Sequence, residues 1–226
     1  MRIPRLLTFL TTLLPGIGAV AQPVPEMSRD NFMVVIRESI GANRAEDAFT
    51  PSGKLKARLP DGQQVEMALA SWEYIADTHI RFVFDGPTTM ANAAPQDLEK
   101  LGIKGVEQAL ALALANIKRV YGAPAATPWS GGVMSVECKS PDLNSSYFLD
   151  KGFWQGLLKT HPEGIVAAVP ARGGLLYTPL SNQQAVDALK RSIAALHASS
   201  ERQRVSSALF LFKDGEWSVF QAPAKP

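Results

Sequence analysis

Arg172 stands in the sequence context that best suits an anion-binding residue. It lies within Pro170-Ala171-Arg172-Gly173-Gly174, where a proline and two glycines predict a tight turn between two strands. An arginine in such a turn can hold a carboxylate or a phosphate through two parallel hydrogen bonds. The alternative is that Arg172 pairs with a structural carboxylate or with a backbone carbonyl.

Asp150 and Trp154 form a second segment that could contact a ligand or a partner. The sequence Asp150-Lys151-Gly152-Phe153-Trp154 places a carboxylate where a helix is expected to begin, with an indole one turn later. The alternative is that Asp150 caps this helix and that Trp154 belongs to the core or to its rim. Arg172, Asp150 and Trp154 are therefore the candidate ligand or partner contacts.

Motifs of catalytic and metal-binding sites are missing from the sequence. His79, His161 and His197 stand far apart, and none belongs to an HxH, HExxH or CxxC arrangement, although the fold could still bring them together. The GxSxG motif of serine hydrolases is absent, and the glycines after Arg172 match neither GxGxxG nor GxxxxGK[ST]. We therefore expect no catalytic residue, no metal ion and no cofactor.

The single cysteine, Cys138, lies in the alternating run 133–138 and shares a strand face with Val136. It has no second cysteine with which to form an internal disulfide. No histidine or cationic cluster stands near it in the sequence to lower the pKa of its thiol. We therefore expect a buried, inert thiol rather than a nucleophile.

The first 21 residues have the pattern of a secretory signal peptide. Arg2 and Arg5 precede an apolar run over residues 6–14, and the segment ends in Ala19-Val20-Ala21. The run is shorter than the roughly 20 apolar residues that span a membrane, so we expect cleavage between Ala21 and Gln22. The alternatives are a buried N-terminal helix and a retained anchor. Because position 22 is not the cysteine of a bacterial lipoprotein, we expect no stable membrane anchor and a periplasmic or secreted location.

Loss of the signal segment makes the chain formally neutral. The full chain has 23 Lys and Arg residues, of which two lie in that segment, so as many basic as acidic residues remain, 21 of each. Proteins that bind nucleic acids through phosphate contacts carry an excess of basic residues. We therefore expect no nucleic acid among the partners.

Apolar spacing and turn residues predict an α+β fold. Helices are predicted at 29–40, where a strand is the alternative, and at 105–121, 151–160 and 182–197. Strands are predicted at 54–59, 63–69, 79–84, 133–138, 145–149, 164–169, 175–178, 205–212 and 216–220. Residues 71–75 are predicted as a short helix or a bridge, and 88–94 and 123–132 as loops. We expect one α+β domain over residues 22–226, with a mainly antiparallel sheet and helices packed largely on one face.

Four motifs between about residues 105 and 221 resemble, in their order, a bacterial family known as domain of unknown function 1444. They are Ala109-Leu110-x-x-Ala113-x-x-Asn116-Ile117, Phe148-Leu149-Asp150-Lys151-Gly152-Phe153-Trp154, Val166-Ala167-Ala168-Val169-Pro170-Ala171-Arg172 and Leu209-Phe210-x-Phe212-x-Asp214-Gly215-x-Trp217. The resemblance implies a compact α+β domain and no assigned activity. The chain departs from the family at Gly173, where an Asp is frequent, and in its export signal, so a cytosolic role does not transfer.

The export signal and the missing catalytic motifs favour an exported, non-enzymatic domain that binds a protein or a small molecule. The alternative is an exported hydrolase of unrecognised type, because the Asp, Glu, Ser and His residues of the chain could meet in space.

Overall fold

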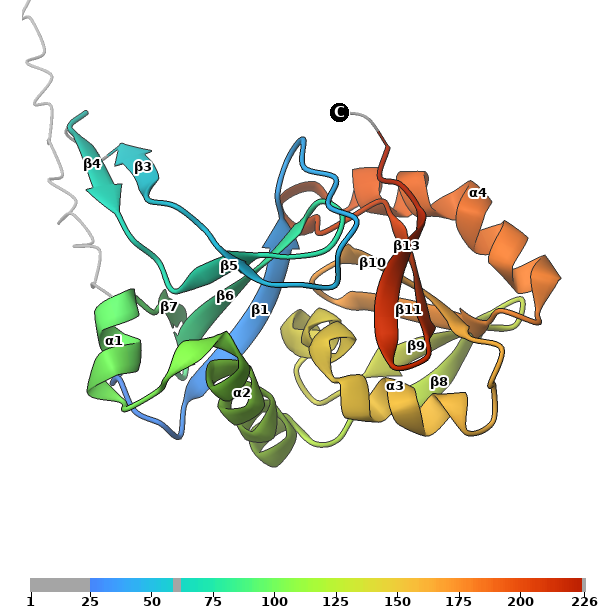
Figure 1. Cartoon of the computed structure of the whole chain (residues 1–226), viewed down its shortest axis with the longest axis horizontal. Helices are drawn as coiled ribbons and strands as arrows, with labels where there is room; N and C mark the ends of the chain where they lie inside the picture. The colour runs from blue at the N-terminus through green and yellow to red at the C-terminus, as the bar shows by residue number, and fades with distance from the viewer. Residues whose placement is uncertain (1–24, 59–61, 225–226) are drawn as a thin grey trace, which may run out of the picture.

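The computed structural model describes residues 25–58 and 62–224. The predicted signal segment, with its cleavage point at Ala21 and Gln22, lies outside the described residues, as do residues 59–61, which include the last residue of the strand predicted at 54–59. Figure 1 shows two sheets side by side, one built by the N-terminal half of the chain and the other by the C-terminal half. Every strand pair in the described part of the chain is antiparallel.

The N-terminal sheet has the order β1-β6-β5-β2, with β7 also paired to β6. Its strands are β1 (Phe32–Glu38), β2 (Thr50–Pro51), β5 (Ser71–Glu73), β6 (Thr78–Asp85) and β7 (Met90–Asn92). A separate hairpin joins β3 (Leu55–Arg58) to β4 (Gln64–Met67), two strands that lie within the predicted ranges 54–59 and 63–69. Two helices follow, α1 (Pro95–Lys100) and α2 (Gly105–Tyr121), and α2 packs against β1.

The C-terminal sheet has the order β13-β12-β10-β11-β9-β8. Its strands are β8 (Ala125–Ser130), β9 (Val133–Glu137), β10 (Ile165–Ala171), β11 (Gly174–Pro179), β12 (Leu209–Lys213) and β13 (Glu216–Gln221). Its helical segments are the 3-10 helix η1 (Pro141–Leu149), α3 (Lys151–Leu158), α4 (Gln183–Ser199) and the short 3-10 turn η2 (Glu201–Gln203). The glycine turn between β10 and β11 is as predicted.

Helices cover both faces of the C-terminal sheet, not largely one. Along β10, Ile165, Ala167 and Val169 belong to the core shared with η1 and α3, while Val166 and Ala168 pack with α4. Because side chains alternate across a strand, these two sets point to opposite faces. All five side chains are fully buried, so each face of the sheet must be covered by other apolar side chains. Figure 1 shows α3 and α4 on opposite sides of the sheet.

The α+β class and the antiparallel pairing are confirmed, but several predicted elements are wrong. Residues 32–38, predicted as a helix with a strand as the alternative, form strand β1, and residues 145–149 belong to the 3-10 helix η1 rather than to a strand. Residues 71–73 form a strand, and the loops predicted at 88–94 and 123–132 contain β7 and β8. Helix α2 has the predicted bounds, 105–121.

The segment η1 connects the two sheets. Strand β1 lies at the edge of the N-terminal sheet, and the Ser146 hydroxyl in η1 donates a hydrogen bond to the Val34 carbonyl on that edge, at 2.8 Å. The Asn116 side chain of α2 donates to the Phe32 carbonyl at 2.9 Å. The ring of Phe148 contacts Tyr74, which follows β5 of one sheet, and Trp217 of β13 in the other, with ring centroids 6.2 and 4.3 Å away. One apolar core therefore extends across both sheets.

Candidate functional site

Two arginines lie on one face of the N-terminal sheet. On β1, Arg37 stands opposite His79 of β6, and two residues along the strands Arg81 stands opposite Val35. Glu73 of β5 is in turn opposite His79. Since residues directly opposite in an antiparallel pair point to the same face, Arg37, His79, Arg81 and Glu73 share one face. All four side chains are half-buried, so this end of the sheet face is polar.

Arg172 adds a third guanidinium to these two, from the other sheet. It lies in the turn between β10 and β11, and its backbone is held on both sides: its N–H donates to the Gln203 carbonyl and its carbonyl accepts from the Ser145 N–H, each at 3.0 Å. These bonds fix the position of the turn next to η1. We call Arg37, Arg81 and Arg172 the arginine cluster.

The positive charges of the arginine cluster are not neutralised by ion pairs. Among the described residues, no carboxylate lies within 4.0 Å of any of these guanidinium groups. The Nε atoms of Arg81 and Arg172 are buried and have no hydrogen-bond acceptor. Buried polar atoms are nearly always paired, so these unpaired atoms are unusual.

The charge of Arg172 lies close enough to Arg37 and Arg81 to lower the pKa of both side chains. Burial, followed by repulsion from Arg172 and Arg81, lowers the pKa of Arg37 to about 9, against a smaller opposing effect of Asp142. Burial and the charge of Arg172 lower the pKa of Arg81. The cluster therefore concentrates positive charge at a point where water screens it only in part.

His79 is neutral and does not add to this charge. Burial is the main cause that lowers its pKa to about 4, and the charge of Arg81 is the second. His79 lies in a chain of polar contacts: its Nε2 is 3.3 Å from Arg81 Nη2, and its Nδ1 is 3.0 Å from Ser39 Oγ. The Ser39 hydroxyl in turn donates a hydrogen bond to the Glu73 carboxylate at 2.7 Å. Arginine can only donate, so Nε2 must accept the hydrogen bond from Arg81. We therefore assign the proton of the neutral imidazole to Nδ1.

The lowered pKa of His79 predicts a loss of stability in mild acid. His79 takes up a proton near pH 6.5 in the unfolded chain but only near pH 4 in the folded chain. The free energy of unfolding therefore decreases as pH falls between these values, by at most about 3 kcal/mol. In His79→Gln this component should vanish. Urea unfolding from pH 7 to pH 4 measures it, with His161→Gln as the matched control. Equal pH dependence in wild type and His79→Gln would contradict the assignment.

Asp150 and Trp154 share no contact with the arginine cluster. The Asp150 carboxylate is 2.7 Å from Lys118 Nζ, an ion pair without hydrogen-bond geometry, and the residue precedes α3 at its N-cap position. Trp154 is fully buried, and its Nε1 donates to the carbonyls of Tyr147 and Phe148. Of the sequence candidates, only Arg172 joins a cluster of unpaired charged side chains.

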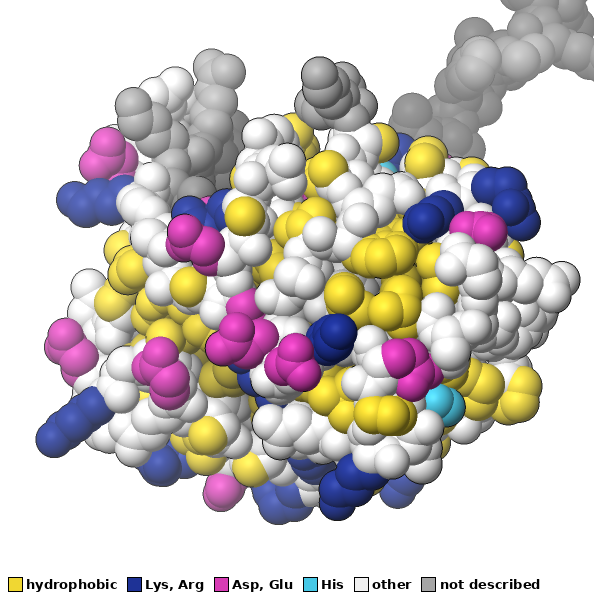
Figure 2. Space-filling view, turned by 45° about the vertical axis from the view of Figure 1, so that its right-hand side comes forward, with side chains coloured by type: hydrophobic (Ala, Val, Ile, Leu, Met, Phe, Trp, Pro, Cys, Tyr) yellow, Lys and Arg dark blue, Asp and Glu magenta, His cyan; other side chains and the backbone are white. Residues whose placement is uncertain are grey.

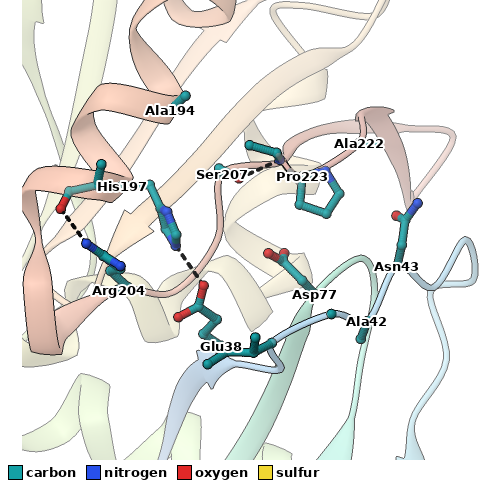
Figure 3. A pocket seen from close by; sticks show the side chains of 14 residues that line it. Glu38, Ala42, Asn43, Asp77, Ala194, His197, Arg204, Ser207, Ala222 and Pro223 are labelled. Atoms are coloured by element: carbon teal, nitrogen blue, oxygen red, sulfur yellow. Dashed lines mark hydrogen bonds and ion pairs between the residues drawn. The ribbon is translucent and has the colours of Figure 1, made fainter. Parts of the chain in front are cut away.

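A cavity of about 570 Å³ lies where β1, α4 and the segment after β13 meet (Figure 3). In it, His197 Nε2 is 2.9 Å from Glu38 Oε1. The Asp77 carboxylate accepts a hydrogen bond from the Ser206 hydroxyl, and burial raises its pKa. The Ser207 hydroxyl accepts from the Ala224 N–H at 2.8 Å. Neither serine contacts His197, so the described residues of this cavity form no serine–histidine pair.

Cys138 is half-buried, and its thiol donates a hydrogen bond to the Ser140 carbonyl at 3.2 Å. Burial raises the pKa of this thiol above its usual value. The thiolate that would act as a nucleophile is therefore less populated than in a free cysteine.

Charges of both signs occur elsewhere on the surface. The face drawn in Figure 2 has acidic side chains across its middle and Lys and Arg side chains mostly near its margins. This mixture agrees with the equal numbers of basic and acidic residues outside the predicted signal segment. The unpaired positive charge at the arginine cluster is thus a local feature and not the result of a basic protein.

Comparison of the chain with protein-family models, with curated proteins and with solved structures found no match. The resemblance to domain of unknown function 1444 therefore stays a prediction. Within residues 25–58 and 62–224, no helix has the length and apolar character needed to cross a membrane. The same residues hold no group of three or more His, Cys, Asp or Glu side chains arranged to bind a metal ion.

Proposed function

We propose that this protein is an exported, non-enzymatic domain that binds an anionic ligand or partner at the arginine cluster. Export rests on the N-terminal signal pattern of the sequence. Anion binding rests on one observation: the two sheets bring Arg37, Arg81 and Arg172 together without a neutralising carboxylate.

The cost of this arrangement supports the proposal. A charged group that is partly removed from water destabilises the fold unless an opposite charge or hydrogen-bond acceptors compensate it. A bound anion would supply both, and guanidinium groups bind oxyanions through paired N–H donors. The two backbone hydrogen bonds that hold the Arg172 turn also reduce the entropy lost on binding.

The hydrolase alternative has no equally specific support. The cavity in Figure 3 holds Glu38, Asp77 and His197, but His197 is engaged by Glu38 and the hydroxyl of Ser206 by Asp77. A serine nucleophile needs a base within hydrogen-bond reach. The hydrolase therefore stays a hypothesis without a site.

Substitution of Arg172 tests the proposal. We expect small oxyanions, namely inorganic phosphate, sulfate, acetate and citrate, to raise the thermal unfolding temperature of the wild-type protein at constant ionic strength, because a ligand that binds only the folded state stabilises it. Arg172→Ala should fold normally and lose most of this increase. Arg191→Ala, an exposed arginine on α4, should keep it. If no anion stabilises the wild type, or if Arg172→Ala responds as the wild type does, the arginine cluster is not the binding site.

A further inference from the structure

The arginine cluster has the charge of a site for a dianion. Near the three guanidinium groups, the carboxylate of Glu73 is already engaged by the hydroxyls of Ser39 at 2.7 Å and Ser52 at 3.3 Å. Asp142 acts on Arg37 only from beyond ion-pair distance, and His79 is neutral. One bound monoanion would neutralise one of the three guanidinium charges, whereas a dianion would neutralise two of them.

The donors of the cluster also come from more than one direction. Arg37 and Arg81 extend from adjacent strands of one sheet, while Arg172 extends from a turn of the other sheet. A planar carboxylate is satisfied by the fork of a single arginine. A tetrahedral phosphate monoester presents three strongly accepting oxygens in different directions, and it carries a charge of about −1.5 to −2 near neutral pH. Donors from two sheets suit the tetrahedral group better than the planar one.

Existing hydrogen bonds position two of these side chains and leave donors free. Arg37 Nη1 donates to the Ile36 carbonyl at 2.9 Å, and Arg81 Nη2 contacts His79 Nε2 at 3.3 Å. In the described part of the chain the other terminal nitrogen of each has no acceptor, and the guanidinium of Arg172 has none at all. Each arginine therefore retains donors for a ligand while two of them are already oriented.

We infer that the arginine cluster binds the phosphate group of a phosphate monoester in preference to a carboxylate. The inference rests on the proposed function and specifies its ligand class. Apart from the His79 imidazole, the strand positions that share a face with Arg37 and Arg81 carry no aromatic side chain: they are Met33, Val35, Thr50, Ser71, Glu73, Val83, Asp85, Met90 and Asn92. No platform for stacking a nucleobase accompanies the arginines there, so the phosphate group itself is what the cluster recognises.

Titration calorimetry with glycerol phosphate and with acetate, at pH 7.5 and matched ionic strength, tests this inference on the full chain. We expect glycerol phosphate to bind at least about tenfold more tightly than acetate. Arg37→Lys and Arg81→Lys keep the charge but lose the planar fork, so each should weaken phosphate binding by about three- to tenfold. Arg191→Lys is the matched control, and unfolding curves of all variants establish that they fold.

The outcomes separate the two proposals. Acetate binding that equals or exceeds phosphate binding, and that Arg172→Ala abolishes, would overturn the phosphate preference and leave the proposed function intact. Absence of binding of either anion would overturn both. Phosphate binding unchanged in Arg37→Lys and Arg81→Lys would also overturn the inference. Flotation with vesicles of phosphatidic acid, against vesicles of phosphatidylcholine alone, distinguishes a lipid headgroup from a free phosphate monoester as the source of the group.

Discussion

Replacement of Trp154 by alanine is expected to destabilise the folded protein by about 3–5 kcal/mol. The side chain is fully buried, and ring centroids of Phe153, Tyr177 and Trp217 lie 5.0, 5.8 and 5.0 Å from its own. Truncation would leave a cavity among these rings that the packed core can fill only in part. It would also remove the donor that pairs with the carbonyls of Tyr147 and Phe148.

Urea unfolding of three variants measures these contributions. Trp154→Phe keeps most of the ring contacts but loses the indole N–H, so we expect a smaller cost of about 1–3 kcal/mol. Trp129→Ala changes a tryptophan that is 49 % exposed and should alter stability by less than about 0.5 kcal/mol. A loss in Trp154→Ala no larger than that in Trp129→Ala would mean that this aromatic group does not hold the core together.

The sequence could not separate Trp154 from Arg172 as candidate contacts. Both stand next to turn or helix-start residues, and both have side chains that are frequent at binding sites. What distinguishes them is their tertiary surroundings. The tertiary structure places five other aromatic rings within 6.5 Å of Trp154 or of its neighbour Trp217, whereas it places two more arginines near Arg172. No local pattern encodes either outcome.

The two long helices could be predicted because their signals are local. In α2, good helix-forming residues with apolar side chains at three- and four-residue steps predict the bounds 105–121, and the structure has them. Helix α4 (Gln183–Ser199) closely matches the predicted range 182–197, and at its start the Asn182 side chain accepts a hydrogen bond from the Ala185 N–H. Neither prediction depends on which other elements these helices contact.

Strand β1 was mispredicted because its apolar residues satisfy two periodicities at once. Phe32, Val35 and Ile36 fall at helical spacing, but all five residues from 32 to 36 are buried. Side chains on both faces of β1 are buried, and α2 packs against this strand. Both sets of its alternating side chains are therefore apolar. Pairing with β6 along all seven residues of β1 determines its conformation, and sequence periodicity carries no information on that pairing.

This error also hid one member of the arginine cluster, Arg37. His79 and Arg81 stand two residues apart on a correctly predicted strand, which places two polar side chains on one face of an otherwise apolar segment. That pattern was a usable signal for Arg81. Arg37 could not be added, because its position opposite His79 exists only when residues 32–38 form a strand. Arg172 approaches from the other sheet and needed the full tertiary structure.

The Asp47 carboxylate is expected to contribute as much to stability as Trp154 does. It accepts hydrogen bonds from the buried Tyr74 hydroxyl and, at 2.9 Å, from the backbone N–H of Trp217. It also lies 2.7 Å from Lys151 Nζ. These three partners belong to the N-terminal sheet region, to β13 and to α3. Only 8 % of the Asp47 side chain is exposed, so its partners would remain poorly hydrated if it were removed.

We therefore expect Asp47→Ala to cost about 3–5 kcal/mol, because the Tyr74 hydroxyl and the Trp217 N–H lose their acceptor and Lys151 loses its counter-charge. Asp47→Asn retains an acceptor oxygen and should cost less, about 1–2 kcal/mol. Lys151→Ala removes a side chain that is 43 % exposed, and water compensates much of that loss, so we expect less than about 1 kcal/mol. Urea unfolding at pH 7 ranks the three variants. If Lys151→Ala were as costly as Asp47→Ala, the ion pair rather than the buried hydrogen bonds would join the two sheets at this point.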